Sequence, residues 1–124
     1  MKVAHVINSL NRGGAESHLL ELVTAQSSHG LIVDVIVIGK DSSDILSIKS
    51  DLSKFCREVH RLKGPRMFNI LSYSKLQKII KANSYDIVHS HQPRSDYMIY
   101  ILKKLIFPKK FFKWIVSIHG KYDS

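Results

Sequence analysis

Histidines mark the ends of two predicted strands. His89 and His91 flank Ser90 where one short apolar strand ends, and His119 ends a later strand beside Gly120. Imidazole exchanges a proton near neutral pH and hydrogen-bonds to sugars and phosphates, so the arrangement predicts a polar site for proton transfer or ligand binding. An HxH pair is also suited to metal, but no carboxylate or third histidine lies close to it in the sequence. We therefore expect no metal.

A pair of glycines precedes a predicted helix. Gly13 and Gly14 follow the first strand, where glycine lets the backbone approach a ligand closely and the helix N-terminus offers free N–H groups to an anion. A phosphate is the natural ligand, and a tight turn that requires positive φ explains the pair equally well. The segment has neither the GxGxxG spacing of dinucleotide sites nor the Lys-Ser/Thr of P-loops. Glu16, in the first turn of that helix, is expected to complement the helix dipole.

The elements that position these residues alternate between strand and helix. The predicted strands span residues 2–7, 31–38, 57–62, 86–90 and 111–118. The predicted helices span residues 15–28, 44–54, 67–82 and 95–107, with Gly30 as the stop of the first and Ser95 as the N-cap of the last. This order predicts an α/β fold, a Rossmann-like parallel sheet of about five strands with helices on both faces. Ligands of such sheets bind beyond the carboxyl ends of the strands, which here are residues 8–14, 39–43, 63–66, 91–94 and 119–124.

Length and composition indicate a single globular domain. The chain has 124 residues, 44% of them hydrophobic, and one domain takes about 150 residues. Cys56 is the single cysteine, which excludes an internal disulfide and a CxxC site and fits a reducing cytosolic setting best. No signal-peptide pattern is present. The longest apolar stretch, residues 97–107, is interrupted by lysines and is shorter than the roughly 20 residues that cross a bilayer.

Basic residues are concentrated in the second half of the chain. The net charge is +9: residues 1–62 hold seven basic and seven acidic residues, whereas residues 63–124 hold twelve and three. Residues 97–114 interleave aromatic and aliphatic side chains with lysines, a pattern that suits an anionic membrane surface. The candidates for membrane contact are Lys103, Lys104, Lys109 and Lys110. A core-facing helix with solvated lysines is a slightly stronger explanation. Nucleic acid is not expected, because arginine is scarce and no nucleic-acid-binding motif is present.

Three short motifs occur in order along nearly the whole chain. They are Asn11-Arg-Gly-Gly-Ala-Glu16, Asp86-Ile-Val-His-Ser-His-Gln-Pro93 and Ile115-Val-Ser-Ile-His-Gly120. Together they resemble the N-terminal, Rossmann-like domain of glycosyltransferase family 4. Members of this family have the GT-B fold, in which two lobes face each other across a cleft, and they transfer a sugar with retention of configuration, usually without a metal. Many act at the cytoplasmic membrane face, so the resemblance implies a cytoplasmic, peripheral protein that needs no cofactor.

The resemblance assigns roles to individual residues. Gly13 and Gly14 would place backbone amides against the diphosphate of a nucleotide-sugar donor. His119 would reach into the cleft near the transferred sugar as the catalytic residue, and His91 and Arg94 would bind the acceptor. That acceptor would be a glycan or a lipid-linked molecule of cell-surface polysaccharide or glycolipid synthesis.

The chain is shorter than the family pattern. The family's second lobe binds most of the nucleotide and carries paired glutamates in an ExxxxxxxE signature, whereas this sequence ends at Ser124, after the fifth strand. We therefore expect residues 1–124 to be a partial acceptor-side lobe that lacks the C-terminal donor-binding domain and transfers no sugar alone. The alternative is a non-catalytic binding or scaffold module that associates with a partner chain or a membrane. A receiver domain is disfavoured, because Asn8-Ser9 and Lys63-Gly64 stand where its acidic residues would be.

Overall fold

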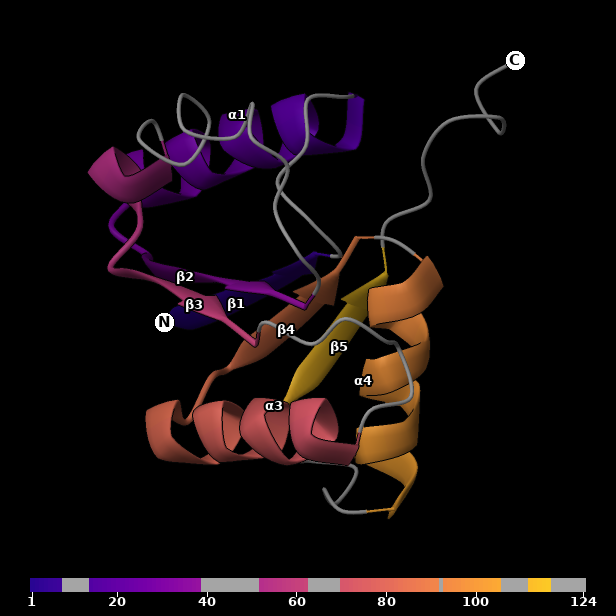
Figure 1. The fold of residues 1–124 in the computed structure, drawn as a ribbon. Helices are drawn as coiled ribbons and strands as arrows, with labels where there is room; N and C mark the ends of the chain where they lie inside the picture. The colour runs from indigo at the N-terminus through magenta and orange to yellow at the C-terminus, as the bar shows by residue number, and fades with distance from the viewer. Residues whose placement is uncertain (8–13, 39–51, 63–69, 92, 106–111, 117–124) are drawn as a thin grey trace.

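Five parallel strands form the centre of the molecule (Figure 1). The computed structural model describes residues 1–7, 14–38, 52–62, 70–91, 93–105 and 112–116. The strands are β1 (Lys2–Ile7), β2 (Ile32–Val37), β3 (Glu58–Arg61), β4 (Ile87–Ser90) and β5 (Lys113–Val116). Their order across the sheet is β3-β2-β1-β4-β5, and all neighbours run parallel. The predicted Rossmann-like parallel sheet is confirmed.

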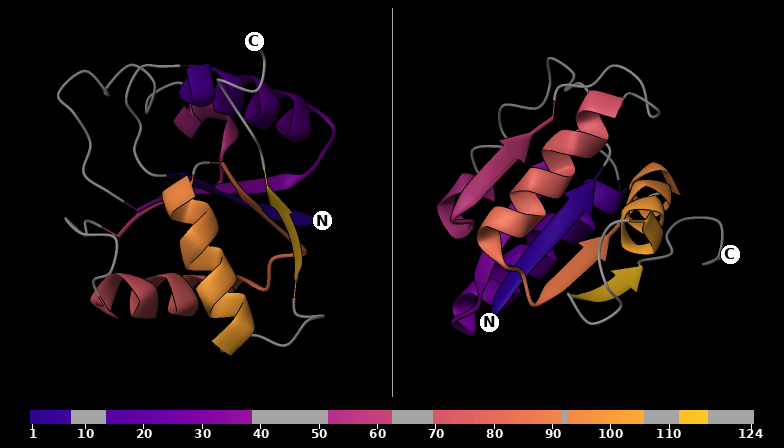
Figure 2. Two further views of the ribbon diagram at one scale, coloured as in Figure 1. Left: turned by 90° about the vertical axis from the view of Figure 1, so that its right-hand side faces the viewer. Right: turned by 90° about the horizontal axis from the view of Figure 1, so that it is seen from below.

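Helices cover both faces of this sheet (Figure 2). The helix α1 (Gly14–Ser28) lies on one face, and α3 (Ile70–Asn83) and α4 (Pro93–Leu105) lie on the other. Two separate apolar cores result, because successive side chains of a strand point to opposite faces. The core on the α1 face contains Ile7, Leu19, Val23, Val33, Val35, Val37 and Leu52. The larger core on the other face includes Ala4, Val6, Ile36, Ile38, Leu76, Ile80, Val88, Met98, Ile99, Leu102 and Phe112.

The position of each strand in the sheet follows its composition. The two central strands β1 and β2 are β-branched, apolar and buried along nearly their whole length, as strands covered on both faces must be. The edge strand β5 is short and amphipathic. Its Trp114 packs against the larger core and donates from Nε1 to Ser90 Oγ at 2.9 Å, while Ile115, on the α1 face, is 37% exposed. Apolar burial therefore decreases from the centre of the sheet toward β5.

Most predicted elements have a counterpart with slightly different bounds. In the predicted helix 44–54, residues 44–51 lie outside the described residues, and residues 52–55 are helical. The prediction of Ser95 as the N-cap of α4 is wrong. The helix begins at Pro93, so Ser95 lies inside it and is fully buried. Proline suits the first helical position because its φ is already helical and the N–H it lacks would have no partner there.

Two helices end at residues with left-handed backbone. Gly30, with φ of 85°, follows α1. Its N–H donates to Ser27 and that of Leu31 donates to Gln26, which is the pair of hydrogen bonds of a Schellman motif. After α3 the same region is adopted by Ser84, with φ of 51°. The end of α1 therefore has glycine, which adopts positive φ without strain, whereas the end of α3 has a serine in the same backbone conformation.

The described part of the chain contains no helix long and apolar enough to cross a membrane.

The two helix ends predict opposite effects of substitution. Gly30→Ala is expected to lower the free energy of unfolding by about 1 kcal/mol, because an L side chain disfavours positive φ. Steric clashes with other residues do not contribute to this loss, since a Cβ at Gly30 would meet no atom within 4 Å. Ser84→Gly is expected to raise the free energy of unfolding by about 0.5–1 kcal/mol, because it removes the same strain. Urea unfolding measures both, and a stabilising Gly30→Ala or a destabilising Ser84→Gly would contradict the assignment.

Candidate functional site

The carboxyl edge of the sheet carries part of the predicted site. The helix α1 begins at Gly14, and His91 directly follows β4. Because β1 and β4 are parallel neighbours, both residues follow strands that end at this same edge. Arg94 lies in the first turn of α4, where the structure describes its backbone and not its side chain. The other predicted site residues lie outside the described residues: Gly13, His119, Lys109 and Lys110.

The His91 side chain is packed into the molecule. Its backbone N–H donates to the Val6 carbonyl oxygen at 3.1 Å, which continues the β1–β4 pairing past the end of β4. Its ring stacks on that of His89, with centroids 4.1 Å apart and planes inclined by 20°. His91 is 1% exposed and His89 is 9% exposed. The two rings therefore lie together on one face of the sheet and are buried there.

A third histidine completes this group. His5, in the middle of β1, is the register partner of His89, so the two side chains lie on the same face. Its ring centroid is 5.2 Å from that of His89 and 5.0 Å from that of His91. His5 Nδ1 lies 2.8 Å from His91 Nε2, and His5 Nε2 lies 2.7 Å from Oε1 of Gln26 on α1. His5, His89 and His91 are hereafter the histidine cluster.

Burial sets the charge of His5. It lowers the pKa of His5 to about 4, against the opposing effect of the hydrogen bond to Gln26 and with further lowering by His89 and His18. The His5 ring is therefore neutral near pH 7. Because the Gln26 oxygen accepts, His5 Nε2 carries the proton, and the bare Nδ1 accepts from His91 Nε2–H. A directed chain of hydrogen bonds thus runs from β4 through β1 to α1.

Sequence reasoning missed both His5 and Gln26. The available signal was a histidine inside the apolar, β-branched run of β1, where a polar ring requires a partner. The partner lies 86 positions away in the sequence and is adjacent only because β1 pairs with β4. The expectation of no metal rested on the absence of a nearby third histidine, and the fold supplies one.

The two described lysines of α4 that were predicted to contact a membrane, Lys103 and Lys104, have different surroundings. Lys103 Nζ donates to the Phe112 carbonyl oxygen at 3.1 Å and lies 4.8 Å from the centroid of the Phe112 ring. Lys103 therefore joins α4 to the start of β5. Lys104 is exposed, and its Nζ lies 5.6 Å from the centroid of the Tyr100 ring. Tyr97, also exposed, lies one turn before Tyr100 on the same helix face.

Comparison with known proteins decides the family. Residues 12–124 match the description "Glycosyltransferase Family 4". The chain belongs to glycosyltransferase family 4. No curated protein matches the sequence. Among solved structures, the chain is similar to sucrose-phosphate synthase from Thermosynechococcus elongatus, with a TM-score of 0.61 and 19% identity over 99% of this chain and 35% of that one.

This likeness shows the fold of the family 4 domain. At such low identity the solved structure shows that the five-stranded sheet corresponds to part of a GT-B enzyme. The domain spans about a third of the length of that enzyme, since it covers 35% of that chain.

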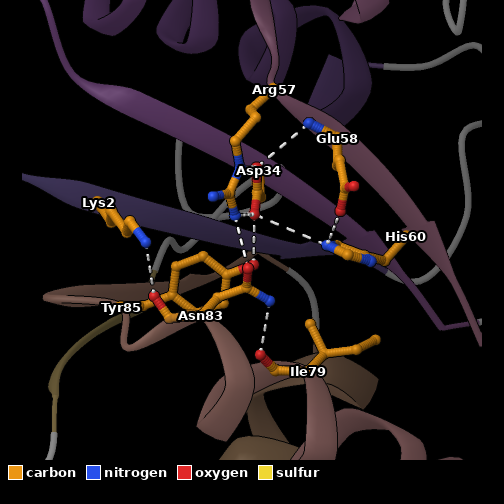
Figure 3. Close-up of polar contacts among 8 residues, drawn as sticks. All are labelled: Lys2, Asp34, Arg57, Glu58, His60, Ile79, Asn83 and Tyr85. Carbon is orange, nitrogen blue, oxygen red and sulfur yellow. Dashed lines mark hydrogen bonds and ion pairs between the residues drawn. The ribbon is translucent and has the colours of Figure 1, made fainter.

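A second polar network lies at the amino-terminal end of the glycosyltransferase sheet (Figure 3). At its centre is Asp34 of β2, which is fully buried. Arg57 donates to the two carboxylate oxygens at 3.1 Å and 2.5 Å, Tyr85 donates its hydroxyl at 2.5 Å, and the backbone N–H of Glu58 donates at 3.2 Å. The network joins β2 to the start of β3 and to Tyr85, two residues before β4.

The Asp34 network serves the fold. Burial raises the pKa of Asp34, but the hydrogen bonds from Arg57 and Tyr85 outweigh it and hold that pKa below its usual range. Asp34, Glu58 and His60 have donor types that hold metals, with His60 Nε2 3.0 Å from Glu58 Oε2. The Arg57 guanidinium already supplies the positive charge that Asp34 requires. We therefore interpret the network as a structural ion pair.

Cys56, close to this network, is not a candidate nucleophile. Its burial, together with the Asp34 carboxylate, raises the pKa of the thiol to about 12. The thiol is therefore protonated and unreactive near neutral pH.

The Asp34 network predicts a pH-dependent stability. Because the pKa of Asp34 is lower in the folded chain than in the unfolded one, its stabilisation is complete above about pH 4 and is lost as pH falls through the folded value. Asp34→Asn is expected to cost about 2 kcal/mol at pH 7, below the 3–5 kcal/mol of fully buried pairs. The reduction reflects the Arg57 side chain, which is 37% exposed.

Urea unfolding at pH 7 and pH 3 measures this cost. The expected loss is smaller at pH 3, because the Asp34 carboxyl of the unfolded chain is then largely protonated, which stabilises the unfolded chain relative to the folded one. Glu21→Gln, which removes an exposed carboxylate on α1, is the matched control and is expected to change stability little at either pH. An equal loss for Asp34→Asn at both pH values would show that its charge is not what stabilises the fold.

Proposed function

We propose that the chain forms the acceptor-side lobe of a retaining glycosyltransferase. The enzyme would move a sugar from a nucleotide-sugar donor to a glycan or lipid-linked acceptor in cell-surface polysaccharide or glycolipid synthesis. The observation that carries the proposal is the family 4 match over residues 12–124 on a parallel sheet whose β1 leads into α1. Donor binding and transfer would require a second, donor-binding lobe, and the chain alone would transfer no sugar.

The donor diphosphate would lie at the N-terminus of α1. This helix spans 15 residues and starts at Gly14. Its first N–H groups have no acceptor within the helix and carry the positive end of the helix dipole, which suits an anion. Gly13 and Gly14 would let the diphosphate approach the backbone without a Cβ in the way.

The acceptor would lie over the ends of β4 and β5. His119, after β5, would be the catalytic residue, and Arg94, in the first turn of α4, would bind the acceptor. Since the His91 side chain is 1% exposed, His91 would support acceptor binding by fixing the strand end that precedes α4. Its hydrogen bond to His5 and its backbone bond to Val6 support that role.

A substitution at Gly14 tests the donor proposal. In a polypeptide that joins this chain to a donor-binding lobe, Gly14→Val is expected to raise the donor KM at least tenfold or abolish transfer, because the side chain would occupy the path of the diphosphate. Thr24→Val, in the same helix away from its N-terminus, is the control and is expected to leave transfer unchanged. Transfer is measured with a radiolabelled nucleotide sugar. Unchanged kinetics for Gly14→Val, or transfer by the 124-residue chain alone, would contradict the proposal.

The exposed face of α4 favours contact with an anionic membrane as part of this function. Tyr97 and Tyr100 are about half exposed, and Leu105, in the last turn, is 73% exposed. Together with the exposed Lys104 they form an aromatic and basic surface of the kind that lies at lipid headgroups. Lys109 and Lys110 would extend it, whereas Lys103 is held by Phe112. The enzyme would then be cytoplasmic and peripheral to the membrane.

Vesicle binding tests the membrane proposal. The double variant Lys104→Gln, Lys110→Gln is expected to weaken binding to phosphatidylserine-containing vesicles about 30-fold at low salt, at about 1 kcal/mol per lysine. Lys78→Gln, Lys81→Gln removes the same charge from exposed positions on α3 and is the matched control, expected to retain most binding. Cosedimentation measures both. Equal losses would assign binding to net charge, and absence of binding by the unmodified chain would exclude the proposal.

The edge strand β5 supports the second candidate, a non-catalytic scaffold module. Ile115 and Val116 are 37% and 43% exposed, and β5 is at the end of the described sheet. An exposed apolar edge strand is a site at which another polypeptide can add a strand. A partner chain bound there, with no transfer by the assembly, would favour this candidate over the enzyme.

A further inference from the structure

The histidine cluster combines three features that proteins use to hold transition metals. Its donors are imidazole nitrogens alone, its rings are buried, and it joins two strands and a helix. We propose that His5, His89 and His91 form a binding site for a divalent transition metal ion, for which Zn²⁺ fits best. The family 4 match does not assign this site, and the proposal does not depend on the proposed transferase function.

The spacing of the donors is close to that of a three-histidine zinc site. One nitrogen from each ring lies within 4.8 Å of the other two. Tetrahedral Zn²⁺ with Zn–N bonds of about 2.0–2.1 Å separates its ligand nitrogens by about 3.3 Å. His5 Nδ1 and His91 Nε2, now 2.8 Å apart, would open by about half an ångström, and His89 would turn toward them. Rotations about the side-chain torsions are sufficient for these changes.

Gln26 provides an independent observation that points to a ligand. Metal-binding histidines almost always donate their second ring N–H to a carbonyl or carboxylate oxygen, which fixes the tautomer and the ring orientation. His5 does so: its Nε2 lies 2.7 Å from Gln26 Oε1, which leaves the Nδ1 lone pair facing His91. A metal would lie between the two nitrogens, and the His91 proton would move from Nε2 to Nδ1, so that both rings bind as neutral imidazoles.

The donor set determines the kind of metal. Neutral imidazoles suit Zn²⁺, Cu²⁺ and Ni²⁺, whereas Mg²⁺ and Ca²⁺ require oxygen ligands. Among the described residues, the other group with suitable donor types is Asp34, Glu58 and His60, and there Arg57 already pairs with Asp34. We therefore expect a single high-affinity site in this part of the chain.

His89 is the most exposed ring of the cluster, at 9%, and its register partner on β5 is Ile115, which is 37% exposed. A metal bound there would cross-link β1 to β4 and, through Gln26, to α1. Such a metal would add to the stability of the central strand pair, since binding that is specific to the folded chain shifts the unfolding equilibrium.

Metal titration of the full 124-residue chain tests the proposal. The protein is prepared without a polyhistidine tag and stripped with a chelator, and Zn²⁺ binding is followed by calorimetry and Co²⁺ binding by visible absorption. We expect one equivalent of Zn²⁺, a tetrahedral Co²⁺ spectrum and a higher unfolding temperature. His89→Gln is expected to weaken Zn²⁺ binding at least about 100-fold, and Gln26→Leu about tenfold. Circular dichroism and melting without metal confirm that each variant is folded.

His29→Gln is the matched control. His29 is an exposed histidine just after α1, and its replacement is expected to leave the stoichiometry and affinity unchanged. Absence of binding by the unmodified chain would overturn the proposal. So would binding that survives both His89→Gln and His91→Gln, or that weakens equally in His29→Gln, because either result would place the metal on surface histidines.

Discussion

The parallel hydrogen bonding of β1 to β2 and to β4 is the constraint on which the rest of the structure depends. β1 is the central strand of the sheet, and its side chains are buried on both faces from Val3 to Ile7. Its register places His5 beside His89, and its Val6 carbonyl oxygen holds the backbone of His91. A slip of one residue would turn every one of its side chains to the opposite face and would separate these groups.

Two buried polar networks, one around Asp34 and one formed by the histidine cluster, lie toward opposite ends of this sheet. At the amino-terminal end, Asp34 is neutralised by Arg57 and receives the Tyr85 hydroxyl, so its charge is fully compensated and it secures the starts of β3 and β4. Nearer the carboxyl edge, a hydrogen bond links His5 to His91, and a second one links His5 to Gln26 of α1. The Asp34 carboxylate is paired with the Arg57 guanidinium, whereas the histidine cluster consists of imidazole rings, of which His5 is hydrogen-bonded to another imidazole and to an amide oxygen. The two networks therefore lie toward opposite ends of the sheet and differ in their chemistry.

The sequence predicted the elements whose signal is local. The β-branched runs of β1 and β2 and the glycine that ends α1 were correctly interpreted, because burial and backbone conformation depend on neighbouring residues. His5 and Asp34 were missed because their partners come from distant strands, so strand order was needed to recognise them. Ser95 was misinterpreted as an N-cap because Pro93 starts the helix earlier. The hydrogen bond from Lys103 to the Phe112 carbonyl oxygen was missed because Phe112 lies outside α4.

The central claim is that the register of β1 against β4 brings three imidazole rings together and determines which ring nitrogens of His5 and His91 carry protons. Long-range ¹H–¹⁵N NMR of the imidazole nitrogens, recorded on the metal-free chain at pH 7, tests this most directly. The structure predicts that His5 is neutral with its proton on Nε2, since burial lowers its pKa to about 4 and Gln26 accepts from it. It also predicts a proton on Nε2 of His91, since His5 accepts from that nitrogen. A proton on Nδ1 of His5, or a His91 ring without a proton on Nε2, would contradict the account.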